Sequence, residues 1–220
     1  TMFCNQCEQT LHGQGCYTFG VCGKSPEIAD IEDIIVYATR GLGLVAREAA
    51  KKGVTDNACG RLCAAALFAT ITNVNFDREP LVAILHKVVD ARNALADKAG
   101  VERKLPIATF EPEKDIEALL AQAKLGSTKT FAPDEDRNSL ARTLLFGLKG
   151  LSAYTDHAAV LGYENPELYD RIYRHLAFGF EGNDPDLNAW VAEVLECGHT
   201  NIMAMELLDK ANTETYGHPE

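Results

Sequence analysis

Apolar side chains recur at every third or fourth position through much of this 220-residue chain, which is the spacing of amphipathic helices. The clearest stripe runs through residues 27–52. It comprises Ile28, Ile31, Ile34, Ile35, Ala38, Leu42 and Val45. The run Ser25-Pro26-Glu27 before it is typical of a helix start, and Gly53 is typical of a helix end. The pattern therefore predicts one long helix here.

The same reasoning predicts further helices along the chain. In the first half they cover residues 58–72 and 78–99, the second of them capped by Asp77 and ended by Gly100. Residues 101–133 are less regular because Pro106, Pro112, Gly126 and Pro133 interrupt them, and only a short helix over 113–124 is predicted there. Beyond them, helices are predicted over residues 134–161, 166–180 and 185–212. No alternating strand pattern of useful length is present.

These elements indicate an all-α fold in which short links join the helices into bundles. We expect a cysteine-rich loop at 1–25, a first three-helix bundle at 26–100, a connecting segment at 101–133 and a second three-helix bundle at 134–220.

The cysteine-rich loop holds four of the seven cysteines, Cys4, Cys7, Cys16 and Cys22, in the spacing C-x2-C-x8-C-x5-C. Glycines at positions 13, 15, 20 and 23 lie among them. Glycine lets a backbone curl tightly and turn its N–H groups toward anionic sulfur atoms. The stretch therefore indicates a metal-binding loop.

Three kinds of cross-link compete for these cysteines. Disulfides are disfavoured because no apolar leader precedes the loop and because seven is an odd number. Structural zinc sites favour two short ligand pairs, whereas only the Cys4–Cys7 pair is short. An iron–sulfur cubane takes one thiolate at each of four well-separated corners, so uneven spacings suit it. The spacing favours iron–sulfur and leaves zinc and disulfides open.

The residues around the cysteines carry a more specific signal. Met-Phe-Cys-Asn-Gln-Cys-Glu-Gln-Thr, followed by Gly-Cys and Gly-Val-Cys-Gly-Lys, resembles the opening of the hybrid cluster proteins, also called prismane proteins or hydroxylamine reductases. Further blocks resemble the same family in the same order. They are LFATITNVNFD (67–77), GLKGLSAYTDHAAVLG (147–162) and MELLDKANTETYGHPE (205–220). The resemblance therefore extends over essentially the whole chain.

The resemblance implies a [4Fe–4S] cluster on Cys4, Cys7, Cys16 and Cys22, because the short spacing is similar to that of the cubane-carrying members. It also implies two three-helix bundles. It further implies that the chain is the N-terminal domain of a longer protein, either as an engineered truncation or as a cleaved fragment. Later domains of that protein would carry the hybrid iron–sulfur–oxygen cluster that reduces hydroxylamine or nitric oxide. We therefore expect an electron-transfer domain with no reductase turnover of its own. The alternative is a non-catalytic helical scaffold or docking module stapled by a metal.

The composition of the chain limits the kinds of partner that we expect it to bind and the compartment in which we expect to find it. The formal net charge of −11 and the sequence pI near 5.0 argue against nucleic acid or an anionic membrane as partner. No apolar run approaches the roughly 20 residues that span a bilayer. We expect a cytoplasmic protein that meets a redox donor protein and the remaining domains of the longer chain. Apolar surface uncovered without those domains could cause self-association.

Other chemically active residues are expected to be structural. Cys59, Cys63 and Cys197 lie on predicted helices and are expected in the core. His12 lies within the cysteine loop and is expected in solvent. His157 is expected to pack or to make a buried hydrogen bond, and His218 is not expected to bind metal.

The carboxylates show no acid–base pair. The acidic runs 30–33 and 134–136 are expected at helix starts, where negative charge complements the helix dipole.

Overall fold

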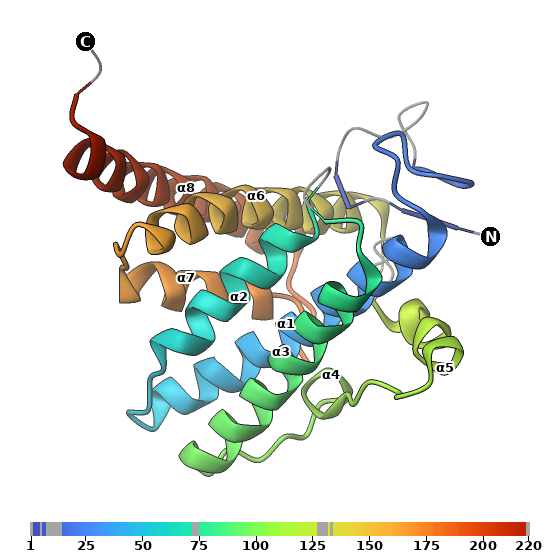
Figure 1. The fold of residues 1–220 in the computed structure, drawn as a ribbon. Coiled ribbons are helices and arrows are strands. Elements are labelled where there is room, and N and C mark those ends of the chain that lie inside the picture. The colour runs from blue at the N-terminus through green and yellow to red at the C-terminus, as the bar shows by residue number, and fades with distance from the viewer. Residues whose placement is uncertain are drawn as a thin grey trace.

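The computed structural model describes residues 2–4, 6–7, 15–71, 75–126, 132 and 134–218. Within these residues the chain is helical and forms no named strand, which confirms the expected all-α class. The helices in chain order are α1 (Pro26–Lys51), α2 (Asn57–Ala69), α3 (Arg78–Ala99), α4 (Pro106–Thr109), α5 (Ile116–Ala121), the 3₁₀ helix η2 (Gln122–Leu125), α6 (Glu135–Val160), α7 (Pro166–Ala177) and α8 (Leu187–Tyr216). Figure 1 shows their arrangement.

The local signals at the helix ends act as their chemistry requires. Ser25 accepts a hydrogen bond from the backbone N–H of Ile28 at the start of α1, and Pro26 follows at the first helical position. Asp77 caps α3 in the same way, and Gly100 ends α3 in the left-handed conformation with φ of 60°. The bounds of α1, α3 and α6 therefore agree with the predicted helices to within one residue.

Three helices differ from prediction at their C-terminal ends. Helix α2 ends at Ala69, and residue 72, where it was predicted to end, lies outside the described residues. Helix α7 ends at Ala177 rather than at 180, because Gly179 has φ of 78° and lies against the ring of Trp190. Helix α8 continues to Tyr216, four residues beyond the predicted end, and stops at Gly217 with φ of 87°.

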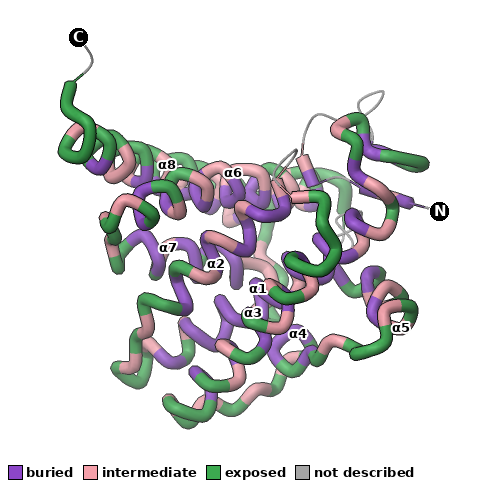
Figure 2. The backbone as a smooth tube through the Cα atoms, viewed as in Figure 1, coloured by how far each residue is buried: buried purple, intermediate pink, exposed green. Residues whose placement is uncertain are grey.

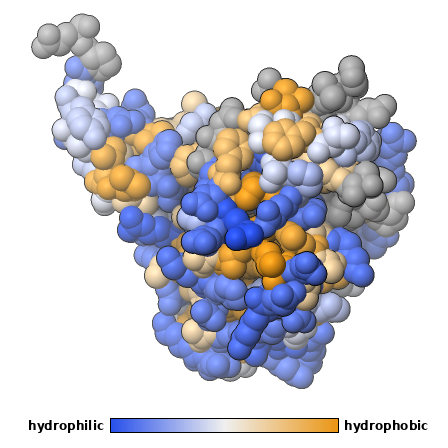
Figure 3. Space-filling model, turned by 45° about the vertical axis from the view of Figure 1, so that its right-hand side comes forward, coloured by the Kyte–Doolittle hydropathy of each residue, from blue (hydrophilic) through white to orange (hydrophobic). Residues whose placement is uncertain are grey.

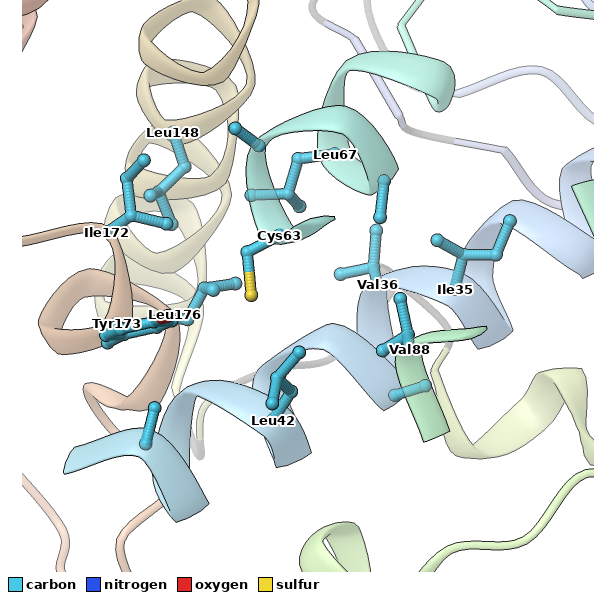
Figure 4. Packing of buried hydrophobic residues seen from close by; sticks show 14 of the residues in the cluster. Ile35, Val36, Leu42, Cys63, Leu67, Val88, Leu148, Ile172, Tyr173 and Leu176 are labelled. Carbon is cyan, nitrogen blue, oxygen red and sulfur yellow. The ribbon is translucent and has the colours of Figure 1, made fainter. Parts of the chain in front are cut away.

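Helix α1 is the central element of the fold, since 18 of its 26 residues are buried. It packs against α2, α3 and α7, while α6 packs against α2 and lies along α8 (Figures 1 and 2). Figure 4 shows side chains from α1, α2, α3, α6 and α7 converging on one apolar interior around Cys63. The helices of both expected bundles contribute to this cluster. The proposed domain boundaries themselves stay a prediction.

A buried polar cluster joins α7 to α8. His175 Nδ1 lies 2.6 Å from Oε1 of Glu193, and His175 Nε2 lies 3.1 Å from the hydroxyl of Thr200. Arg174 donates to the other carboxylate oxygen of Glu193 at 2.7 Å. Burial raises the pKa of Glu193, but the hydrogen bonds from His175 and Arg174 outweigh it and hold that pKa below its ordinary 4.5.

This cluster predicts a pH-dependent contribution to stability. A carboxylate with a depressed pKa stabilises the fold above its unfolded pKa, and that stability is lost as the pH falls through the folded pKa. Glu193→Gln should be about 2 kcal/mol less stable than wild type near neutral pH. The difference should shrink as the pH falls below about 4.5 in urea unfolding followed by circular dichroism. A difference that does not change with pH would contradict the assignment.

Replacement of a helical glycine by alanine should have opposite effects on stability at Gly60 and at Gly198. A Cβ atom at Gly60 in α2 would lie 2.3 Å from Cγ of Tyr169 in α7, whereas a Cβ at Gly198 in α8 would meet nothing within 4 Å. Gly60→Ala should lower the free energy of unfolding by about 1–3 kcal/mol. Gly198→Ala should raise it by up to about 1 kcal/mol, because alanine favours the helix. Urea titrations of both variants measure this, and equal effects would refute the close helix contact.

Candidate metal centre

The first and third cysteines of the loop, Cys4 and Cys16, lie side by side. Their backbones form an antiparallel bridge with two hydrogen bonds of 2.9 Å, one in each direction. Both residues are buried, in a small apolar cluster with Met2 and Ala29 of α1. The bridge brings together two cysteines that are twelve positions apart in the sequence. This half of the loop therefore rests on the start of the central helix.

A tight turn positions Cys22. The N–H of Gly20 donates to the carbonyl of Lys24, and the N–H of Gly23 donates to the carbonyl of Gly20. A Cβ at Gly20 would lie 3.1 Å from the sulfur of Cys22 and 2.9 Å from Cβ of Lys24, so only glycine fits without displacement. Gly23 adopts φ of 97°, which also favours glycine. Gly20 thus brings the backbone close to the sulfur of Cys22, while the expected turning of N–H groups toward the sulfurs stays a prediction.

The donor set fits a thiolate-bound metal in its chemistry. All seven cysteines lie among the described residues, and none of them forms a disulfide. Burial raises the pKa of Cys4 to about 11, and the nearby Lys24 opposes this rise. The cysteines are not gathered round one point, however. Within the described ranges no group of three or more His, Cys, Asp or Glu side chains is arranged to hold a metal ion. The four-cysteine ligand set stays a prediction.

Beneath the loop lies a buried polar network that sequence reasoning missed. Its members are Gln6, Lys24, Glu32, Asp33 and Lys149, each no more than 3% exposed, together with the backbone carbonyl of Thr70. Lys24 pairs with Glu32, Gln6 donates to Asp33, and Lys149 donates to Gln6. Both lysine ammonium groups also reach the Thr70 carbonyl, Lys24 at 3.3 Å and Lys149 at 3.4 Å.

The network corrects the expectation for the acidic run 30–33. Glu32 and Asp33 lie in the second turn of α1 and face the interior, so they do not serve the helix dipole in the first turn. The other run behaves as expected, because Asp134 caps α6 and Glu135 and Asp136 occupy its first turn. The difference is one of packing, since both runs have the same acidic composition.

The buried charges perturb one another strongly. Burial raises the pKa of Glu32 to about 7, against the attraction of Lys24 and Lys149. Burial likewise raises the pKa of Asp33 well above its ordinary value. Burial lowers the pKa of Lys149 to about 8, while Glu32 opposes the shift. Among the described residues, Oε1 of Glu32 has no hydrogen-bond partner. Each charge therefore depends on its neighbours for compensation.

The sequence offered weak signals for these residues. Gln6 lies between two cysteines, Lys24 lies two positions after Cys22, and Lys149 interrupts an otherwise apolar and glycine-rich stretch of α6. A lone lysine among residues such as Leu148 and Leu151 is a candidate for a buried charge. Only contacts across the chain reveal which partner it meets.

The remaining cysteines are core residues, as expected. Cys59, Cys63 and Cys197 are all buried, and burial raises the pKa of Cys59 to about 11 and that of Cys197 to about 12. Figure 4 shows the Cys63 sulfur pointing into the apolar interior. None of the three lies in the cysteine loop.

Among the described residues, no histidine belongs to a group of side chains arranged to hold a metal ion. His157 is exposed and packs edge-on against the ring of Phe68, with the two ring centroids 5.0 Å apart, so of the two expected roles the structure shows packing. His218 is exposed beyond the end of α8. His12 lies outside the described residues.

Apolar side chains are exposed next to the cysteines. Tyr17, Phe19 and Val21, between Cys16 and Cys22, are each about half exposed. Apolar areas interrupt the otherwise hydrophilic face drawn in Figure 3. No helix in the described part of the chain is both long and apolar enough to cross a membrane.

Comparison with known proteins identifies the family of this chain. Residues 2–220 match the Prismane/CO dehydrogenase family, and the chain belongs to that family. It is 47% identical to a hydroxylamine reductase of Solidesulfovibrio magneticus and 48% identical to one of Syntrophobacter fumaroxidans. A hydroxylamine reductase of Methanocella arvoryzae is 44% identical. Each match covers 99% of this chain but 41% of the relative, so the chain spans about two fifths of their length.

The buried Lys24–Glu32 pair predicts a large stability effect. Lys24→Met leaves the Glu32 carboxylate buried without its closest cation, which typically costs about 3–5 kcal/mol. The loss of stability should be smaller at about pH 5.5 than at about pH 8, on either side of the raised pKa of Glu32. A carboxyl with a pKa of about 7 is mostly neutral at the lower pH and needs no cation there.

Chemical denaturation of the single variant and of Lys24→Met/Glu32→Leu measures this cost. The double variant should recover most of the loss, because it leaves no unpaired charge. Equal stability of the single variant and wild type at both pH values would show that the pair is not buried as described.

Proposed function

We propose that this chain is an electron-transfer module that holds a [4Fe–4S] cluster on Cys4, Cys7, Cys16 and Cys22. The supporting observation is a set of four cysteines within one loop, none of them in a disulfide and two of them joined by the backbone bridge, in a chain of the Prismane/CO dehydrogenase family. A cluster bound by four cysteines has every iron closed by protein, so the chemistry it supplies is one-electron transfer.

The residues of the chain have separate tasks in this proposal. The four thiolates hold the irons, and the bridge and the Gly20 turn bring the backbone close to the sulfurs. The small apolar cluster that Cys4 and Cys16 form with Met2 and Ala29 keeps water away from these two cysteines. The exposed Tyr17, Phe19 and Val21 leave the other side open to a redox donor protein.

In the whole protein, the module would relay electrons to a hybrid iron–sulfur–oxygen cluster in later domains. The relatives named hydroxylamine reductase support this larger role. Since the chain spans only about 41% of those relatives, we expect no hydroxylamine or nitric oxide reduction by the chain alone. We place the protein in the cytoplasm, with the remaining domains and an electron donor as partners and without nucleic acid or membrane.

A second candidate function is a non-catalytic helical scaffold or docking module, stapled by a metal. The observation that favours it is the buried network, because Lys24, Lys149 and Gln6 attach the loop to the helices whatever metal it holds. A colourless zinc protein, or a cluster that dithionite cannot reduce, would support this alternative.

Cysteine substitutions test the electron-transfer proposal. After anaerobic purification the wild type should be brown, contain about four irons and four sulfides per chain, and show an electron paramagnetic resonance signal on reduction with dithionite. Cys4→Ser and Cys22→Ser should each lose most of the iron, because each removes one corner ligand. Far-ultraviolet circular dichroism should remain helical, since α1 to α8 do not include the loop.

Cys197→Ser provides the matched control, because Cys197 is a buried cysteine on α8 outside the loop. It should retain wild-type iron. Full iron retention in both loop variants would mean that the ligand set is wrong.

A further inference from the structure

The two lysines beneath the cysteine loop converge on a single backbone atom. Lys149, from the middle of α6, and Lys24, from the end of the loop, both place their ammonium nitrogen within 3.4 Å of the Thr70 carbonyl oxygen. Thr70 is the C-cap of α2 and is fully buried. The carbonyl end of a helix carries partial negative charge, so cations are stabilised there. The end of α2 is thus a built anchoring point for two positive charges.

Each lysine is also tied to one end of the cysteine motif. Lys149 donates to the side chain of Gln6, which lies between Cys4 and Cys7. Lys24 lies two residues after Cys22, and its carbonyl accepts the hydrogen bond that closes the Gly20 turn. The first and last cysteines of the motif are therefore joined through two lysines to one point on the helical body.

We propose that Lys149 and Lys24 are positioning residues that clamp both ends of the cysteine motif onto the end of α2 and hold fixed positive charge beside the metal site. This inference rests on the proposed function. Reduction of an iron–sulfur cluster adds one negative charge, so a buried cation nearby favours the reduced state and raises the reduction potential. A buried carboxylate in the same network acts in the opposite direction.

Because the network holds charges of both signs, the direction of each shift in reduction potential tests the proposal. Lys149 and Glu32 are both buried and belong to the same network, but their charges are opposite. If the role were purely structural, removing either residue would loosen the loop. The shifts in reduction potential would then be unrelated to the sign of the charge removed. An electrostatic role makes the two variants shift the potential in opposite directions.

The experiment is an anaerobic redox titration of the 220-residue protein, followed by electron paramagnetic resonance at about pH 7.5, between the pKa of Glu32 and that of Lys149. Lys149→Met should shift the midpoint potential to a more negative value, and Glu32→Gln should shift it to a more positive one. Lys149→Arg, which keeps the charge, should stay closer to wild type than Lys149→Met does. Lys98→Met is the matched control, because Lys98 lies on the exposed side of α3, and it should leave the potential unchanged.

The clamp has a readout that requires no cluster. Gln6→Met keeps both lysines but removes the link from Lys149 to the loop, so amide hydrogen exchange at residues 2–7 should become about tenfold faster or more. If Lys149→Met does not fold, Glu32→Gln and Gln6→Met together decide the outcome. A positive potential shift in Glu32→Gln with faster exchange in Gln6→Met supports the proposal, and any other result for the pair overturns it.

Failure of the inference is distinguishable from failure of the proposed function. If the wild type binds no reducible cluster, the electron-transfer function is wrong, and the clamp is then judged by hydrogen exchange alone. If the cluster is present and reducible but Lys149→Met and Glu32→Gln leave the potential unchanged, or shift it in the same direction, the electrostatic role is overturned while the function stands.

Discussion

The structure around the cysteine loop depends on one requirement: the four buried charged side chains beneath the loop must each be compensated. Lys24, Glu32, Asp33 and Lys149 are almost fully removed from water, and burial of an uncompensated charge would cost several kilocalories per mole. They are tolerated because each meets an opposite charge, an amide or the Thr70 carbonyl. The loop, the start of α1, the end of α2 and the middle of α6 must therefore occupy fixed relative positions.

Helix α1 connects this polar end to the apolar core. Its first turns contribute Glu32 and Asp33 to the network, while its later turns contribute apolar residues to the cluster shown in Figure 4. Apolar burial supplies the stability of the helical body, and the polar network fixes where the loop sits upon it. A site formed by a loop thus acquires the rigidity of packed helices, which is what precise placement of ligands requires.

The chain belongs to the Prismane/CO dehydrogenase family and matches only one part of its relatives, which suggests the setting in which it functions. The relatives named hydroxylamine reductase extend well beyond the segment that matches this chain. Under the proposed electron-transfer function, the chain would keep one face for a redox donor and pass electrons inward. The cysteine loop combines an apolar exposed side, at Tyr17, Phe19 and Val21, with a buried charged side. That asymmetry is consistent with such a position.

The sequence by itself determined the long helices, the caps of α1 and α3 and the four-cysteine motif, because helix periodicity, capping and short cysteine spacings are local properties. Only the tertiary structure decided that Glu32 and Asp33 face inward, that His175 meets Glu193, and that Lys149 reaches Gln6. The Lys149–Gln6 contact joins residues 143 positions apart, and the contact of Lys149 with Thr70 spans 79. No local pattern encodes such pairs. They arise because packing of the helices leaves each buried charge one place where it can be compensated.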